Sequence, residues 1–224
     1  MTGRRLRRLL GGLVFFPVAL AGCSGEEPEQ PAPVPTVKRM SVDQACAGLF
    51  PGDGGKALER VLESTEFLLR NEKWSPDVRA VAQVMENAYR SGDRIRNMPQ
   101  STCEVSGVEK ERHTPSAIVR FTASSKWDDS SAGSDRGVWV STRERKVVDL
   151  AYDCVSPRVG STPEAPLRVG LLFQDRWQGS KGEDVLRPDY LTVTHSAALA
   201  VARELQCVDD GGLPARAGDL PPPD

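Results

Sequence analysis

The chain has few of the residues from which catalytic and metal sites are most often built. Its two histidines, His113 and His195, lie far apart in the sequence. A helical metal-binding pair, which needs two histidines three or four residues apart, is therefore excluded. The sequence also has no Gly-x-Ser-x-Gly nucleophile elbow and no glycine-rich phosphate loop after a predicted strand. We therefore expect no metal, no cofactor and no enzymatic activity.

Long apolar runs and clusters of positive charge are also scarce. The apolar stretch 9–21 has about a dozen residues, which is too short for a comfortable membrane-spanning helix. Lysine and arginine total 29 against 31 acidic residues, so the formal net charge is −2. No basic segment outside the N-terminal leader rises above this background, and nucleic acid is not an expected partner.

The first residues carry a recognisable export signal. Four arginines between positions 4 and 8 precede the apolar stretch, which ends at Leu20-Ala21-Gly22-Cys23. A small-residue site followed directly by cysteine resembles the lipobox of bacterial secreted lipoproteins. The resemblance implies that 1–22 is a signal peptide and that Cys23 carries the lipid anchor, with palmitate among its acyl chains. An ordinary secretory signal is the alternative, and Sec-type export is favoured over the twin-arginine route.

The rest of the chain divides into three parts. Residues 23–40 interleave glutamate with proline, cannot bury apolar surface and are predicted to form an extended tether. Residues 41–208 are expected to form a single domain, which is long enough for a proper hydrophobic core. The glycine- and proline-rich residues 209–224 are predicted to be a disordered tail.

Four cysteines follow the anchor: Cys46, Cys103, Cys154 and Cys207. An even count in an exported chain favours two disulfides over free thiols, and the wide spacing argues against zinc. Four cysteines permit three pairings. We favour Cys46–Cys103, which would join the opening helix to the first strand. Cys154–Cys207 would then join the closing helix to a strand on which Cys154 shares the apolar side.

Helices are predicted on both sides of a run of strands. Ser41 to Gln44 fits a capping box, and the short helix that follows should break at 51–55. Ser75-Pro76-Asp77 is typical of a helix start. The predicted helices cover 41–50, the segment around 58–62, 77–91 and 189–206.

From Cys103 onward the apolar period changes to two. Apolar residues alternate with polar ones over 117–123, 148–154 and 167–173, with shorter runs at 67–69 and 138–140. Such alternation is typical of antiparallel strands with one exposed face. The fold class we predict is α+β: an antiparallel β-sheet meander with N-terminal helices and one C-terminal helix, packed in a two-layer sandwich.

With these elements the chain resembles the small secreted lipoproteins of actinobacteria. The resemblance is carried by the lipobox, the acidic tether, Val-Asp-Gln-Ala-Cys-Ala-Gly-Leu-Phe at 42–50 and Ala-Leu-Ala-Val-Ala-Arg-Glu-Leu-Gln-Cys at 198–207. It implies a sandwich similar to that of photosystem II extrinsic proteins and a binding or accessory role. It supplies no catalytic residues.

Two groups of polar residues are candidate sites. The loop 126–135 carries three acids and several hydroxyls, but its spacing does not match an EF-hand, so a solvated hairpin connection is favoured over a calcium site. Asp149 and Asp153 share the outer face of one predicted strand. Paired carboxylates can act as acid and base, but on an exposed sheet face a solubilising role is favoured.

Three tryptophans are the candidate binding residues: Trp127, Trp139 and Trp177. Trp139 attracts most interest, because strand alternation points it away from its neighbours Val138 and Val140. We expect a lipid-anchored protein on the extracytoplasmic face of the cell membrane, acting as a non-catalytic binding or accessory module. Its partners would be membrane lipid, through the anchor, and an unknown envelope protein or ligand. An envelope hydrolase with a dispersed site is the alternative.

Overall fold

The computed structural model describes residues 38–68, 73, 75–96, 98–108, 114–124, 137–142, 146–177 and 182–223. The predictions for the signal peptide, Cys23, His113, Trp127 and the loop 126–135 fall outside these residues.

The described strands form one antiparallel sheet, in the order β1-β2-β3-β4-β7-β6-β5. Their bounds are β1 Arg39–Met40, β2 Phe67–Leu68, β3 Thr102–Gly107, β4 Ser116–Ser124, β5 Trp139–Ser141, β6 Val147–Cys154 and β7 Leu167–Asp175. Two runs of sequential strands, β1 to β4 and β5 to β7, meet where β7 pairs with β4. The antiparallel sheet is confirmed, with β5 at the edge and not beside β4.

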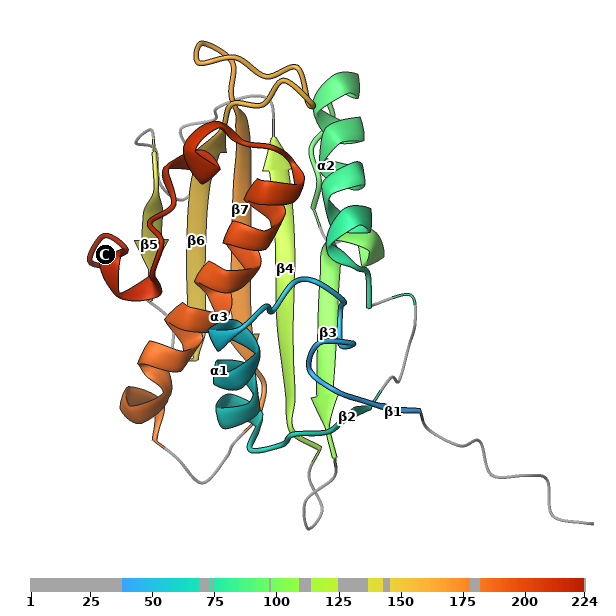
Figure 1. Cartoon of the computed structure of the whole chain (residues 1–224), viewed down its shortest axis with the longest axis vertical. Helices are drawn as coiled ribbons and strands as arrows, with labels where there is room; N and C mark the ends of the chain where they lie inside the picture. The colour runs from blue at the N-terminus through green and yellow to red at the C-terminus, as the bar shows by residue number, and fades with distance from the viewer. Residues whose placement is uncertain are drawn as a thin grey trace, which may run out of the picture. The chain divides into compact units, whose positions relative to one another are not determined.

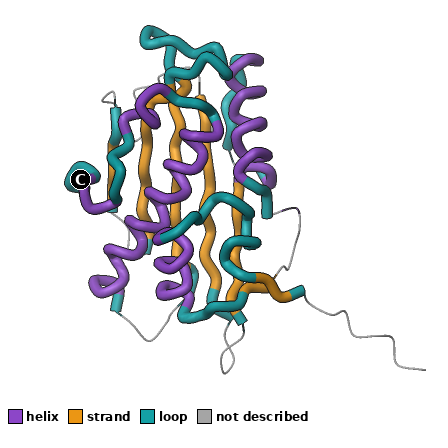
Figure 2. The backbone as a smooth tube through the Cα atoms, viewed as in Figure 1, coloured by secondary structure: helices purple, strands orange, loops and turns teal. Residues whose placement is uncertain are grey.

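Three α-helices lie on one face of this sheet: α1 Asp53–Leu62, α2 Val78–Ser91 and α3 Glu183–Glu204 (Figures 1 and 2). Short 3-10 helices are η2 Pro99–Ser101, η3 Val208–Gly212 and η4 Ala217–Asp219. The predicted two-layer α+β class is thus confirmed. In the described part of the chain, no helix has the length and apolar character needed to span a membrane.

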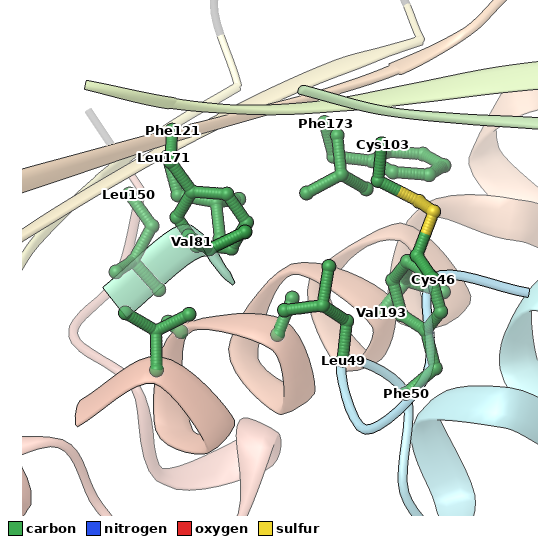
Figure 3. Close-up of a cluster of buried hydrophobic side chains, with 14 of the residues drawn as sticks. Cys46, Leu49, Phe50, Val81, Cys103, Phe121, Leu150, Leu171, Phe173 and Val193 are labelled. Atoms are coloured by element: carbon green, nitrogen blue, oxygen red, sulfur yellow. A yellow bond between two sulfur atoms is a disulfide. The ribbon is translucent and has the colours of Figure 1, made fainter. Parts of the chain in front are cut away.

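The core lies between the helices and the inner face of the sheet (Figure 3). The inward residues Phe121, Leu171 and Phe173 are almost completely buried, as are Val81 and Val193 on the facing helices. Each large apolar side chain buried in this way stabilises the fold by about 1.5–3 kcal/mol. The residues that point outward from the same strands lie on the opposite face of the sheet from this core.

Two disulfides join the layers, in the predicted pairing. Cys46 bonds to Cys103 on β3, and Cys154 at the end of β6 bonds to Cys207 after α3. The first is drawn in Figure 3, at the border of the core. Closing loops of more than fifty residues stabilises a fold by roughly 4 kcal/mol per bridge in the loop-entropy treatment.

The segment 41–50 corrects one helix prediction. The Ser41 amide does donate to Gln44 Oε1 at 3.1 Å, as in a capping box, but the chain continues as turns. Cys46 has a φ of 52°, which is outside the right-handed helical region. This turn places Leu49 and Phe50 in the core, so tertiary contacts override the local helix signal.

α1 and α3 begin earlier in the sequence than their glycine and proline residues predict. α1 begins inside the predicted break, at Asp53. At Gly54 a Cβ would lie 2.2 Å from Ser196 Oγ of α3. Glycine there permits close helix packing. α2 is capped by Asp77, whose side chain accepts from the Ala80 amide at 2.7 Å. α3 begins six residues before the predicted start, with Pro188 in its second turn and Leu186 buried.

The domain is longer at both ends than predicted. Arg39 and Met40, assigned to the tether, pair with β2. Residues 208–223 form η3, η4 and connecting turns, and Leu213 is buried among core residues. His195 Nε2 lies 2.7 Å from the Pro214 carbonyl oxygen and helps to hold this segment. The prediction of a disordered tail is therefore wrong over 209–223.

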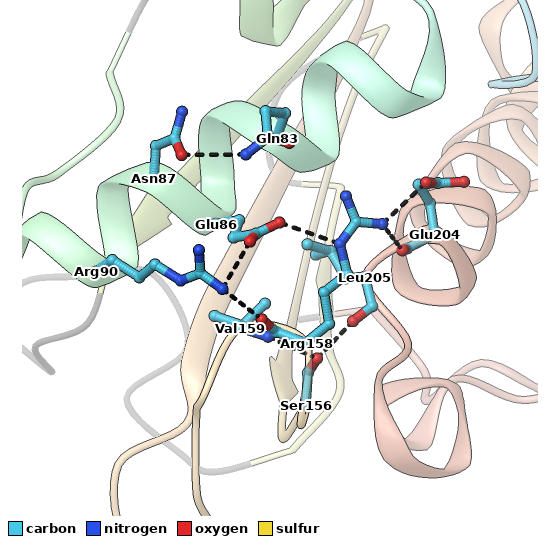
Figure 4. Close-up of polar contacts among 9 residues, drawn as sticks. All are labelled: Gln83, Glu86, Asn87, Arg90, Ser156, Arg158, Val159, Glu204 and Leu205. Carbon is cyan, nitrogen blue, oxygen red and sulfur yellow. Dashed lines mark hydrogen bonds and ion pairs between the residues drawn. The ribbon is translucent and has the colours of Figure 1, made fainter.

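A charged network ties α2 to the end of α3 (Figure 4). Arg158 donates from Nε to Glu86 Oε2 at 3.1 Å and from Nη1 to Glu204 Oε1 at 2.9 Å. Arg90 completes it with an ion pair to Glu86 at 2.8 Å. The hydrogen bond to Glu204, with help from Glu86, raises the pKa of Arg158 above its ordinary value. The helical layer is therefore held in place by both disulfides and ion pairs.

Candidate functional site

The outer face of the sheet, opposite the helices, is built from rows of side chains that the strand register aligns. One row runs Thr122–Gly170–Ala151–Trp139 across β4, β7, β6 and β5. On either side of it lie the rows Arg120–Leu172–Asp149 and Ser124–Arg168–Asp153. The central row has glycine and alanine at its middle, between rows of larger side chains. A depression follows from this pattern of side-chain sizes.

This depression is a hollow of about 390 Å³, which we call the outer-face hollow. Its size falls within the range of small-molecule sites. Its lining residues are Arg94, Ile95, Arg96, Arg120, Thr122, Ala123, Ser124, Trp139, Asp149, Leu150, Ala151, Arg168, Gly170, Leu171 and Leu172. Gly170 lies at the floor, where a Cβ would lie 2.4 Å from Thr122 Oγ1 and Thr122 would have to move.

Two of the arginines come from the segment after α2. Ile95 forms an antiparallel bridge with Ala123 of β4 and is buried. Because successive residues of an extended chain point to opposite faces, Arg94 and Arg96 project on the outer side. Both are exposed and line the hollow at its β4 side.

Arg168 is a fixed wall of the hollow. Its side chain is 9% exposed, and its Nη1 donates to Gly137 O at 2.7 Å and to Asp153 Oδ1 at 3.1 Å. Asp153 Oδ2 in turn accepts from the Gly137 amide at 3.0 Å. Burial lowers the pKa of Arg168, and the charge of Asp153 opposes this change. The Arg168–Asp153 pair therefore fixes the start of β5 in place.

Arg120 is held differently. Its side chain is half-buried in the hollow, and its Nε is fully buried with no hydrogen-bond partner among the described residues. A buried donor left without an acceptor costs about 1–3 kcal/mol. Groups of this kind are rare in folded proteins, and an ion or a water at the position is one explanation for them.

The electrostatic character of the hollow differs from that of the chain. Four arginines line it, while Asp149 is the single acidic residue among the described lining residues. The whole chain carries a formal net charge of −2. Low-dielectric walls around such a cluster concentrate its positive potential at the opening. Because Asp153 pairs with Arg168, the excess positive charge of the lining comes from Arg94, Arg96 and Arg120 against Asp149.

The predicted site residues meet only in part. Trp139 is half-buried and lines the hollow, and it points to the outer side as strand alternation predicts. Trp177 follows β7 at the end where Asp175 pairs with Ala117, away from Arg168, and it does not line the hollow. Of these two tryptophans, Trp139 alone therefore lies at the hollow.

The two predicted carboxylates also have separate positions. Asp149 lines the hollow, but Asp153 is bonded to Arg168 and to the Gly137 amide. Asp153 therefore serves to position β5. His195 is 5% exposed and contacts the C-terminal segment, on the helical side of the sheet. No group of three or more metal-ligating side chains occurs within the described ranges.

Sequence reasoning missed the arginines. Arg120 and Arg168 occupy the polar phase of their strands, which was the available signal. That phase does not tell which strands are neighbours, so it could not bring β4, β7 and the 94–96 segment together.

In comparisons with known proteins, no family model, curated protein sequence or solved structure matches the chain.

Proposed function

We propose that the protein is a lipid-anchored binding or accessory module on the extracytoplasmic face of the cell membrane. Its working surface would be the outer-face hollow. The observation that carries this proposal is the hollow itself: a concave, arginine-lined site with a half-buried tryptophan on a sheet whose other face is fully committed to the core. Rigid strands that present a few polar groups in a pocket are typical of ligand sites.

The two layers support a division of roles. On the helical face, two disulfides and the Arg158 network hold the helices and the adjoining segments in place. The outer face carries the cluster of arginines at the hollow, and Arg120 there has a donor without an acceptor among the described residues. Binding on the outer face would leave the core and its links unchanged.

Location is tested at Cys23. Replacing it in Cys23→Ala removes the thiol that the lipobox resemblance assigns to the anchor. We expect the variant to leave the membrane fraction and to appear in the medium or as uncleaved precursor, measured by fractionation and mass spectrometry. A variant that stays membrane-bound and is processed as before would contradict the anchor.

Binding is tested by photo-cross-linking in intact cells. A photoreactive amino acid replaces Trp139 in one variant and the exposed Arg79 of α2 in a matched control. We expect adducts from position 139 that are absent at position 79 and that disappear when Arg120→Glu is added. Equal adducts at both positions, or adducts at 139 that persist with Arg120→Glu, would contradict binding at the hollow.

A further inference from the structure

We infer that the outer-face hollow binds a small organic anion whose carboxylate or phosphate contacts Arg120 and whose planar, apolar part lies against Trp139. This inference rests on the proposed binding function and names the chemistry of the ligand. It follows from three features of the hollow: the distribution of charge, the flat floor and the distance between its two walls.

The charge is distributed unevenly. Arg120 lies on β4, and Arg94 and Arg96 lie beside that strand, next to Ile95. Asp149 lies two strands away on β6. An anionic group is therefore attracted more strongly to the β4 side, where three of the arginines lie. The hollow thus has a defined orientation for a molecule with charge at one end only.

Arg120 is the side chain best suited to the anionic end. Its guanidinium is half-buried, and its Nε donor has no acceptor among the described residues. Carboxylate and phosphate oxygens match the planar fork of donors on a guanidinium and form paired hydrogen bonds with it. The neighbouring exposed Arg94 and Arg96 would strengthen the attraction.

The opposite wall and the floor suit a planar group. Trp139 on β5 ends the row that begins at Thr122 on β4, and Gly170 and Ala151 lie between them. Three strand spacings separate the two ends, which is about 14 Å. The small residues keep the floor near the level of the backbone. A molecule of one or two fused rings with a single anionic group fills such a space.

The test measures binding of three matched probes to the full chain in detergent by isothermal titration calorimetry. The probes are 2-naphthoate, 2-naphthyl phosphate and the neutral 2-naphthamide. We expect at least one anion to bind tenfold or more tightly than the amide, which is a difference that calorimetry resolves. The tighter of the two anions identifies the group as carboxylate or phosphate. Failure of both anions to bind at millimolar concentration would overturn the inference.

Variants assign the binding to the hollow. Arg120→Gln is expected to weaken the bound anion tenfold or more and to leave the amide unchanged, whereas the control Arg79→Gln changes neither. Trp139→Ala is expected to weaken all three probes. If the anions and the amide bind equally well and all three depend on Trp139, the inferred preference for an anion is wrong. The proposed binding function would remain intact. Anion binding that Arg79→Gln reduces as much as Arg120→Gln would overturn the inference as well.

Discussion

Gly170 lies at the centre of the hollow's floor, and its missing side chain sets the depth of the hollow. Its neighbour across the β4–β7 pair is Thr122, whose Oγ1 occupies the space that a Cβ would need. The two residues therefore depend on each other. A strand glycine weakens the sheet locally, and close approach of a neighbour is one reason for its use.

Replacing this glycine should destabilise the protein through a specific contact. In Gly170→Ala the new Cβ meets Thr122 Oγ1 at 2.4 Å, and we expect the free energy of unfolding to fall by about 1–3 kcal/mol. The double variant Gly170→Ala/Thr122→Ala should recover most of this loss, because the clashing hydroxyl is gone. Denaturant unfolding measures both. Losses that simply add would show that this contact is not the cause.

At the scale of elements, α2 and α3 meet through Arg158 of the loop between β6 and β7. Glu86 is 7% exposed, and its buried carboxylate is compensated by two guanidinium groups, those of Arg158 and Arg90. A buried carboxylate that loses one of two such partners is less well compensated. The network therefore fixes how the helical layer is assembled.

Removing the Arg158 guanidinium should matter far more than removing an exposed one. Arg158→Met keeps most of the side-chain volume but leaves Glu86 with Arg90 alone and removes the pair with Glu204, and we expect a loss of about 1–3 kcal/mol. The control is Arg39→Met, whose pair with Glu66 is exposed on both sides and should change stability by about 0.5 kcal/mol or less. Thermal and denaturant unfolding compare the two. Similar losses for both would refute the role of the network.

Strand periodicity was predictable, because alternation is a local property of the sequence. The cysteine pairing was favoured among three possible ones from where the cysteines lie relative to the predicted helices and strands. Cys154, for example, is in phase with the apolar residues of β6, and it pairs as expected. Local signals failed where packing between layers decided the outcome. The 41–50 segment turns at Cys46, Gly54 permits contact with α3, and Leu186 extends α3 across Pro188.

Two residues of the site, Trp139 and Asp149, were predicted on the outer face, and the rest were not. Alternation placed Trp139 on the outer face, and the structure places it in the hollow. The arginines are brought there by the β4–β7 pair and by the bridge of Ile95 to Ala123, which join segments far apart in the sequence. Pairing of this kind depends on the whole fold, so no single stretch of sequence carries the signal.

At the scale of the whole molecule, the two faces of the sheet have different structural surroundings. The inner face provides the core and the covalent links, and the outer face presents the arginine-lined hollow. The proposed anchor at Cys23 would confine this hollow to the membrane surface. The proposed binding at the outer face would leave the core unchanged, because the core residues lie between the helices and the inner face.

The most direct test of binding at the outer face compares two tryptophans in one molecule. Trp139 and Trp177 are both half-buried, but only Trp139 lines the hollow. Hydroxyl-radical labelling, read by mass spectrometry, is carried out on intact cells and on purified full chain in detergent. The account predicts that Trp139 is oxidised several-fold less in cells while Trp177 is unchanged. Equal oxidation of Trp139 in both preparations would contradict it.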